Sequence, residues 1–167
     1  MPRYLYLLRH AESSEKIPGQ PDIERDLTSR GMREAILVGT YLHKENTSFD
    51  KVLCSIAERA KATASLMADA MKFDIEKIVA EDALYEASTR TFFQFISQIN
   101  DDHQKVLCIA HNPSISYLAE SFTKAEIGDM PPCGLAIIKF NVNSWKDVSQ
   151  GNGELQNYIN PAMLSEY

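Results

Sequence analysis

Two histidines and two arginines in this sequence could together bind and transfer an anionic group. Arg9 and His10 follow the first apolar run, His111 follows a later one, and Arg59 lies just beyond Ser55, the last residue of another. Arginine presents planar, permanently charged N–H donors that match phosphate oxygens. Nearby arginines favour the neutral form of a histidine, which can act as a covalent nucleophile. The set is suited to phosphoryl transfer, in which catalysis rests on positioning and charge stabilisation.

Each of these residues also has an ordinary structural explanation when it is taken alone. A histidine after a strand is commonly a loop or capping residue, and an arginine in a first helical turn is commonly exposed. His10 and Glu12 form a His-x-Glu pair, but no further His/Cys pair lies at the spacing of a metal site. We therefore expect neither a metal nor a cofactor, and only the four residues together indicate a site.

Continuous apolar runs and helical periodicity alternate along the chain. Buried strands are predicted at 3–8, 51–55 and 105–110. Further strands are predicted at 77–84, 134–142 and 153–159, the first and last of them at sheet edges. Helices are predicted at 27–46, 57–72, 88–99 and 112–122. The expected N-caps are Thr28, Ser88 and Asn112, with Pro113 in the first turn of the last helix. The first helix should bury Met32, Ala35, Ile36, Gly39 and Leu42.

This alternation is typical of an α/β fold. We expect a three-layer α/β/α sandwich around a mostly parallel central sheet. In such sheets, ligands bind beyond the carboxyl ends of the strands. Strand polarity therefore brings Arg9, His10, Arg59 and His111 to one edge of the sheet. The helix that follows His111 adds backbone N–H groups for an anion.

Composition narrows the class of protein further. The 167 residues and 18.8 kDa fit one domain over 1–167. The net charge of −6 argues against a nucleic-acid partner, and no apolar run reaches membrane-spanning length. Three cysteines without a CxxC pair are typical of reduced, buried thiols and predict a cytoplasmic location. No long exposed apolar stripe is evident, so we expect a monomer, whose last residues are either a docked tail or disordered.

The motifs around these residues resemble those of the histidine phosphatase superfamily, in particular its small SixA-like phosphohistidine phosphatases. "LLRHAES" is similar to the RHG signature in its RHA form, "RDLTSRG" to RPLTxxG, and "CSIAERAKATA" to SPxxRAxxTA. "IAHNPSIS" resembles the second-histidine motif GHNPxxS, and "MPPCGLAIIKF" resembles the loop and strand that close the SixA-type domain. Ala11 and Ile56 depart from a glycine and a proline, but neither change removes a catalytic group. The resemblance covers nearly the whole chain and implies a phosphoglycerate mutase-like fold.

Carried over residue by residue, the resemblance implies that His10 accepts the phosphoryl group. Arg9, Arg59 and His111 would then surround and neutralise its oxygens. Arg25, in "ERDLTSRG", matches a further arginine that lines the SixA-type site, although a surface arginine in a charged loop gives the same pattern.

Three further assignments concern the edges of the site. "ALYEAS" places Glu86 where larger superfamily members carry an acid that protonates the leaving group, but a solvated loop carboxylate would look the same. Asn112 is assigned to the substrate-binding set. Thr28 and Gly31 are expected to shape the helix entry rather than touch substrate.

The length of the segment between the Arg59 helix and the His111 strand bears on the substrate. It holds one predicted edge strand and one helix, where larger relatives insert helices that cover the site. We therefore expect an open, shallow pocket, which suits a side chain displayed on another protein better than an enclosed metabolite. An imidazole leaving group needs no strong general acid, whereas an alkoxide does.

The leading hypothesis is a metal-independent phosphatase with a phosphohistidine enzyme intermediate. Its substrate would be phosphohistidine on a phosphorelay or phosphotransfer protein, such as a histidine phosphotransfer domain. The first alternative is a broad-specificity phosphomonoesterase for small phosphate esters, with Glu86 as general acid. The second is a phosphate-binding domain without activity. A mutase is disfavoured, because moving a phosphoryl group within one bound substrate requires enclosure.

Overall fold

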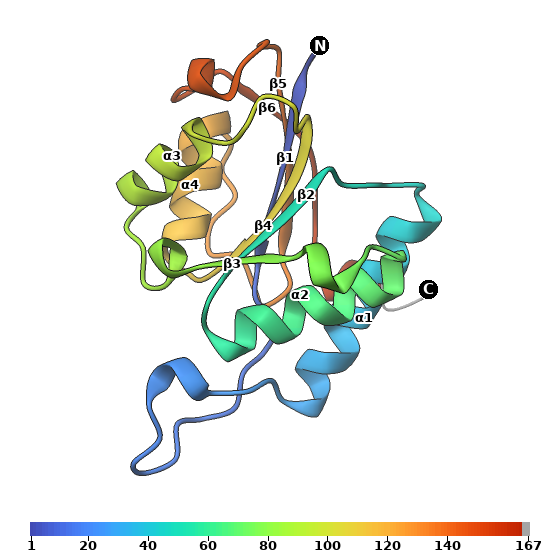
Figure 1. Ribbon diagram of the computed structural model, residues 1–167, viewed down its shortest axis with the longest axis vertical. Helices are drawn as coiled ribbons and strands as arrows, with labels where there is room; N and C mark the ends of the chain where they lie inside the picture. The colour runs from blue at the N-terminus through green and yellow to red at the C-terminus, as the bar shows by residue number, and fades with distance from the viewer. Residues whose placement is uncertain (165–167) are drawn as a thin grey trace.

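The fold is organised around a six-stranded mixed sheet (Figure 1). The computed structural model describes residues 1–164. The strands are β1 (Arg3–Arg9), β2 (Lys51–Ser55), β3 (Val79–Glu81), β4 (Lys105–Ala110), β5 (Leu135–Phe140) and β6 (Gly153–Ile159). Their order is β3-β2-β4-β1-β5-β6; the first four are parallel, and β5 and β6 are antiparallel to their neighbours. The mostly parallel sheet predicted from the sequence is confirmed, with β3 and β6 at its edges.

Helices cover both faces of this sheet. α1 (Ser29–Lys44) and α2 (Glu58–Met71) lie on one face, and α3 (Thr89–Ser97) and α4 (Ser114–Thr123) lie on the other (Figure 1). Short 3₁₀ segments complete the described chain: η1 (Asp22–Glu24), η2 (Ile75–Lys77), η3 (Asp82–Leu84), η4 (Trp145–Asp147) and η5 (Pro161–Leu164). The three-layer α/β/α sandwich is confirmed.

Strand β1 shows why the central runs lack polar alternation. Leu5 and Leu7 are buried in the apolar cluster under α3 and α4, whereas Tyr6 and Leu8 are buried in the cluster under α1 and α2. A strand between two helical layers must be apolar on both faces. The continuous apolar run is therefore what this position in the sheet requires.

Two of the three predicted helix caps are confirmed. The Thr28 hydroxyl accepts a hydrogen bond from Gly31 N, and the Ser88 hydroxyl accepts one from Thr91 N. The predicted cap at Asn112 is wrong. α4 begins at Ser114, after Pro113, and no side chain caps it. The Asn112 amide is instead used in long-range hydrogen bonds described below.

The buried face of α1 also differs from the prediction. Met32 and Ile36 are 42% and 45% exposed, so their expected burial is wrong. A Cβ on Gly39 would lie only about 3 Å from Ala70 and Met67, so this glycine sets a close approach between α1 and α2. The helix buries Gly31, Ala35, Val38, Gly39 and Leu42. Because α1 packs closely against α2 along these residues, Met32 and Ile36 lie at the edge of the contact and remain partly exposed.

The strand predicted at 77–84 is shorter in the structure than expected. β3 stops at Glu81, and residues 82–84 form η3 instead of continuing the strand.

Burial raises the pKa of Cys54 to about 11 and those of Cys108 and Cys133 to about 12, so all three free thiols stay protonated. Within residues 1–164, no helix combines the length and apolar character needed to cross a membrane. Leu164 is buried, so the tail is docked as far as that residue, and residues 165–167 lie outside the described residues.

Candidate active site

The parallel pairing of β1 with β4 brings the two histidines together. Arg9 lies opposite Ala110 in the register, so His10 and His111 directly follow neighbouring strands at one edge. His10 N donates to the Ala110 carbonyl at 2.9 Å. The juxtaposition predicted from strand polarity is therefore built into the backbone of the sheet.

The ring of His10 is held in one tautomer. Its Nδ1 lies 2.8 Å from the Ala11 carbonyl oxygen, which can only accept, so Nδ1 carries the proton and Nε2 keeps its lone pair. Burial, helped by the positive charges of Arg59 and Arg9, lowers the pKa of His10 to about 4. At neutral pH the side chain is uncharged, and its Nε2 lone pair can act as a nucleophile.

A buried threonine joins the nucleophile to the arginine helix. Thr63 is fully buried on α2, where its hydroxyl accepts from Ala11 N at 3.0 Å and donates to the Arg59 carbonyl at 2.7 Å. Because Arg59 and Thr63 are one helical turn apart, the "RAKAT" spacing serves both functions. Thr63 is not among the residues expected at the site from the sequence; its place in the RAxxTA-like motif is the signal that could have found it.

Arg9 is held through a second network around the carbonyl of Met130. This oxygen accepts from Arg9 Nη1 at 2.8 Å and from Asn112 Nδ2 at 3.0 Å. Ser116 closes the ring, since its hydroxyl donates to Asn112 Oδ1 at 2.6 Å and accepts from Met130 N at 3.0 Å. Both ends of the Asn112 amide are thus engaged in holding the 130–133 segment beside Arg9.

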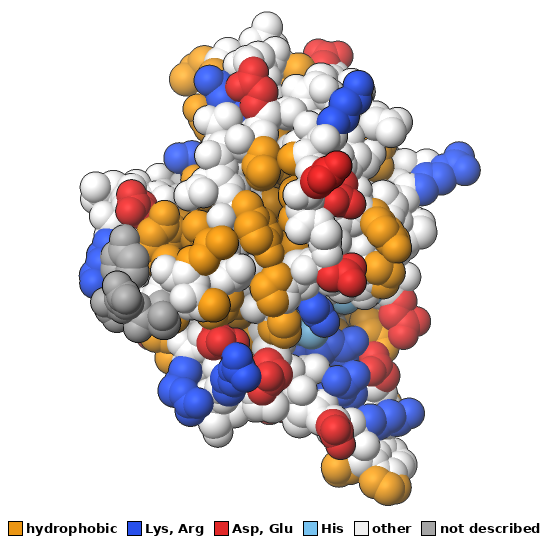
Figure 2. All heavy atoms as spheres, turned by 180° about the vertical axis from the view of Figure 1, so that it is seen from behind, with side chains coloured by type: hydrophobic (Ala, Val, Ile, Leu, Met, Phe, Trp, Pro, Cys, Tyr) orange, Lys and Arg blue, Asp and Glu red, His pale blue; other side chains and the backbone are white. Residues whose placement is uncertain are grey.

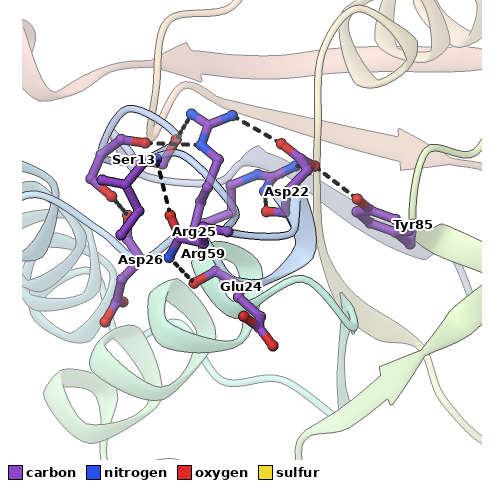
Figure 3. Close-up of polar contacts among 10 residues, drawn as sticks. Ser13, Asp22, Glu24, Arg25, Asp26, Arg59 and Tyr85 are labelled. Carbon is purple, nitrogen blue, oxygen red and sulfur yellow. Dashed lines mark hydrogen bonds and ion pairs between the residues drawn. The ribbon is translucent and has the colours of Figure 1, made fainter.

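Arg59 meets a carboxylate that the sequence did not reveal as part of the site (Figure 3). Its Nη1 donates to the Asp22 carbonyl at 2.9 Å, and its Nη2 donates to Asp22 Oδ2 at 3.0 Å. The Tyr85 hydroxyl donates to the same Oδ2 at 2.8 Å. Hydrogen bonds from Tyr85, Arg59 and Arg25 outweigh burial and lower the pKa of Asp22 to about 2. Nothing in the local pattern around Asp22 or Tyr85 indicated this contact.

Arg25 reaches the site through Asp22. It donates from Nη1 to Asp22 Oδ1 at 3.1 Å, from Nε to the Ser14 carbonyl at 2.9 Å and from Nη2 to the Ser13 hydroxyl at 2.8 Å (Figure 3). All three nitrogens of the guanidinium therefore bind the loop between β1 and α1. Arg25 therefore links Ser13 and Ser14, at the start of the loop, to Asp22, which is hydrogen-bonded to Arg59.

The entry to α1 is shaped as predicted. Thr28 N donates to the Glu12 carbonyl at 3.0 Å, and the Thr28 hydroxyl donates to Glu12 Oε1 at 2.8 Å. A Cβ on Gly31 would collide with the same Glu12 carbonyl. Glycine is therefore required where the helix start crosses the loop.

His111 and Glu86 form the outer side of the site. Burial and the charge of Arg59 lower the pKa of the half-buried His111, while the carboxylates of Glu86 and Asp22 oppose this shift. Glu86 is exposed and has a left-handed backbone, with φ of 52°. Its neighbours are anchored on both sides, because the Ala87 carbonyl accepts from Ser114 at 2.6 Å and Tyr85 bonds Asp22. A non-glycine residue in this conformation costs about 1 kcal/mol or more, which is common at functional positions.

Basic side chains and a histidine gather on one face of the molecule (Figure 2). Figure 2 shows histidine and Lys or Arg side chains together at the surface, below a group of apolar side chains. Between α2 and β4 the chain forms one α-helix, α3, which packs against α4. A hollow of about 320 Å³ lies next to the loop that follows His10, lined by Glu12, Arg30, Glu34, Pro131, Pro132, Asn160, Pro161 and Ala162. Among residues 1–164, no group of His, Cys, Asp and Glu side chains has a metal-binding arrangement.

Comparisons with known proteins agree with this geometry. A model of the histidine phosphatase superfamily (branch 1) matches residues 5–92. An uncharacterised protein of Mycobacterium tuberculosis is 32% identical, over 92% of this chain and 99% of its own. The adenosylcobalamin/alpha-ribazole phosphatase of Escherichia coli is 43% identical over 65 residues, which are 38% of this chain and 31% of that protein.

Solved structures give the same result for the fold. SixA from Agrobacterium tumefaciens superposes with a TM-score of 0.82 and 25% identity, covering 96% of this chain and 99% of that one. The protein histidine phosphatase SixA complexed with tungstate has a TM-score of 0.82 at 21% identity, with the same coverage. The chain belongs to the histidine phosphatase superfamily. Its phosphoglycerate mutase-like fold and SixA-like architecture, both predicted from the motifs, are confirmed.

Proposed function

We propose that this protein is a phosphatase that works through a phosphohistidine intermediate on His10, and that it dephosphorylates phosphohistidine on a phosphotransfer protein. The observation that carries the proposal is the state of His10. Its Nδ1 proton is bound by the Ala11 carbonyl, which leaves the Nε2 lone pair unprotonated, and burial together with the charges of Arg59 and Arg9 lowers its pKa to about 4. A neutral imidazole close enough to two guanidinium groups to feel their charge is matched to attack on an anionic phosphoryl group.

The reaction takes place in two balanced steps. His10 Nε2 forms a bond to phosphorus while the bond from phosphorus to the leaving nitrogen or oxygen breaks, and the leaving group takes up a proton. Water then attacks the phosphohistidine, the bond from phosphorus to nitrogen breaks, and inorganic phosphate leaves with His10 restored. Arg9, Arg59 and the helix start after His111 would bind the phosphoryl oxygens. Arg9 Nε is buried without a partner among residues 1–164, and an oxyanion that reached it would offset that cost.

The short segment between α2 and β4 and the chemistry of the leaving group support the protein substrate. One α-helix between α2 and β4 leaves little chain to enclose a small metabolite. An imidazole departs from phosphorus without a strong general acid, so the reaction does not depend on Glu86. Two SixA proteins have the same architecture, and one of them is described as a protein histidine phosphatase.

One observation favours the alternative, a phosphomonoesterase for small esters. Glu86 has a left-handed backbone conformation, and it is near enough to His111 for its negative charge to raise the pKa of that histidine. An acid at this position could protonate an alkoxide leaving group. In that case Glu86 is a catalytic residue rather than a rim carboxylate.

The test compares turnover on a phosphorylated histidine phosphotransfer protein with turnover on a panel of phosphate monoesters. We expect phosphate release from the protein, a trapped phospho-enzyme in samples quenched with denaturant and kept at alkaline pH, and a loss of about a thousandfold or more in His10→Ala. Glu86→Gln should leave the protein reaction within about threefold.

Each other outcome has a defined meaning. Activity on esters alone, lost in Glu86→Gln, supports the phosphomonoesterase. Phosphate binding without a phospho-enzyme on any substrate indicates a binding domain and refutes both enzymatic proposals.

A further inference from the structure

The arginine expected to bind the phosphoryl group is already paired with a carboxylate of the same chain. Arg59 is 8% exposed and uses both terminal nitrogens on Asp22, one for the carbonyl and one for Oδ2. A site made of Arg9, Arg59 and two histidines therefore contains a fixed negative charge. An anion in the site must share Arg59 with Asp22.

Several groups hold this carboxylate in place. Tyr85 and Arg25 bind its two oxygens from different parts of the chain, at 2.8 and 3.1 Å (Figure 3). Burial and the Asp22 charge raise the pKa of Tyr85 to about 12, so its hydroxyl remains a donor. With a pKa of about 2, Asp22 stays ionised at every working pH and cannot act as a general acid. Its effect on the reaction has to come from its charge and its hydrogen bonds.

We propose that Asp22 is a positioning and charge-balancing residue of the phosphoryl site: it orients Arg59 before substrate binds, and it limits how tightly the site holds free phosphate. The proposal rests on the proposed function of the site, which it deepens. Asp22 bonds one edge of the guanidinium and fixes the direction of the remaining N–H groups. Its negative charge disfavours any bound anion, including the inorganic phosphate left by hydrolysis.

The physical reason concerns the difference between the transition state and the product. Arginines bind the oxygens of the ground state, the transition state and the product alike, and uniform binding of this kind slows product release. A rigidly placed carboxylate that is hydrogen-bonded to Arg59 weakens all three. In return, it keeps Arg59 oriented for the transition state without reorganisation during the reaction. Removing the charge should therefore tighten phosphate binding while lowering turnover.

The experiment measures the affinity of inorganic phosphate by calorimetry and the kcat for the protein substrate, in wild type and in Asp22→Asn. Asparagine keeps the size of the side chain and removes the charge. Glu24→Gln is the matched control, because Glu24 is an exposed carboxylate on the same short η1 segment. We expect phosphate to bind Asp22→Asn about tenfold more tightly and Glu24→Gln unchanged, since charges a few ångströms apart interact strongly near a protein surface. The kcat of Asp22→Asn should fall about tenfold.

A merely structural role gives the opposite sign. It predicts a lower melting temperature with weaker or unchanged phosphate binding, and that result in folded Asp22→Asn overturns the proposal. Tyr85→Phe provides a second variant if Asp22→Asn does not fold. It keeps the charge and removes one anchor, so kcat should fall while phosphate affinity stays within about twofold of wild type. Tighter phosphate binding in Tyr85→Phe would show that the charge of Asp22 is not responsible, and would also overturn the proposal.

The phosphate titration needs no turnover. If wild type forms no phospho-enzyme, the proposed function fails. The charge-balancing role of Asp22 is then still decided by the affinities alone.

Discussion

The two halves of the candidate active site are positioned by different kinds of hydrogen bond: one by backbone bonds of the sheet, the other by side-chain bonds of a loop. His10 and His111 follow the adjacent strands β1 and β4. Two successive backbone N–H groups lead into His10 and bond to opposite sides of the chain: Arg9 N to Gly134 O at 3.0 Å and His10 N to Ala110 O at 2.9 Å. Asp22 and Arg25 lie in the loop between β1 and α1. Their positions depend on side-chain bonds to Ser13, Arg59 and Tyr85.

This difference suggests that the strand-borne residues carry out the reaction and that the loop-borne residues adjust its affinity and rate. The strand-borne half is fixed by the hydrogen bonds of the sheet, which no single side-chain change removes. The loop-borne half is held by a few charged side chains, so one substitution can alter how Arg59 is presented. Loops on a rigid scaffold are the usual place for such tuning. We therefore expect changes in the loop to affect affinity and turnover rates without abolishing the reaction.

The comparison predicts its largest effect on kcat/KM, for substitutions of Arg59 and Arg25. Arg59→Met should reduce kcat/KM by about 100-fold or more, because it removes a donor aimed at the developing charge. Arg25→Met should cost about tenfold, since Arg25 acts through Asp22. Steady-state kinetics on the phosphorylated protein measure both, with Arg33→Met, an exposed residue of α1, as control. Equal losses in the two variants would mean that Arg25 binds the phosphoryl group directly.

The next effect is on pH dependence. The pKa of His10 is lowered from its ordinary 6.5 to about 4, so the nucleophile stays neutral until the pH falls through about 4, and kcat/KM should decline only below that point. Between pH 6.5 and about 4, His10 binds a proton in the unfolded chain but stays unprotonated in the folded protein. The free energy of unfolding should therefore decrease as the pH drops from 6.5 towards 4.

An NMR titration of the His10 ring measures this pKa directly. Arg59→Met should raise it, because the charge of Arg59 contributes to the lowering. A His10 pKa near 6.5 in wild type would contradict the expected environment.

The smallest effect tests the link between the halves. Thr63→Val removes the acceptor of Ala11 N and leaves a buried N–H group unpaired, which should cost about 1–3 kcal/mol in the free energy of unfolding. Thr63→Ser keeps the hydroxyl and should lose less. Urea unfolding followed by circular dichroism compares the three proteins. If the valine variant matched wild type, the Thr63 bridge between β1 and α2 would not be a stabilising contact.

The sequence by itself determined the framework of the site. Apolar runs without alternation identify buried parallel strands, and parallel strands place the residues after them at one edge. Strand polarity alone therefore places Arg9, His10, Arg59 and His111 at the same edge. The caps at Thr28 and Ser88 were also predictable, because each cap involves residues only three positions apart.

Only the tertiary structure decided how the site is held. The bond between Tyr85 and Asp22 joins residues 63 positions apart, and the bond between Thr63 and Ala11 spans 52. Asn112 has an ordinary capping sequence, but its amide binds Met130 across 18 positions instead. No local pattern records which distant group a polar side chain will meet, because that choice depends on the packing of helices and loops around the finished sheet. Local periodicity places residues on an edge, whereas long-range packing selects their partners.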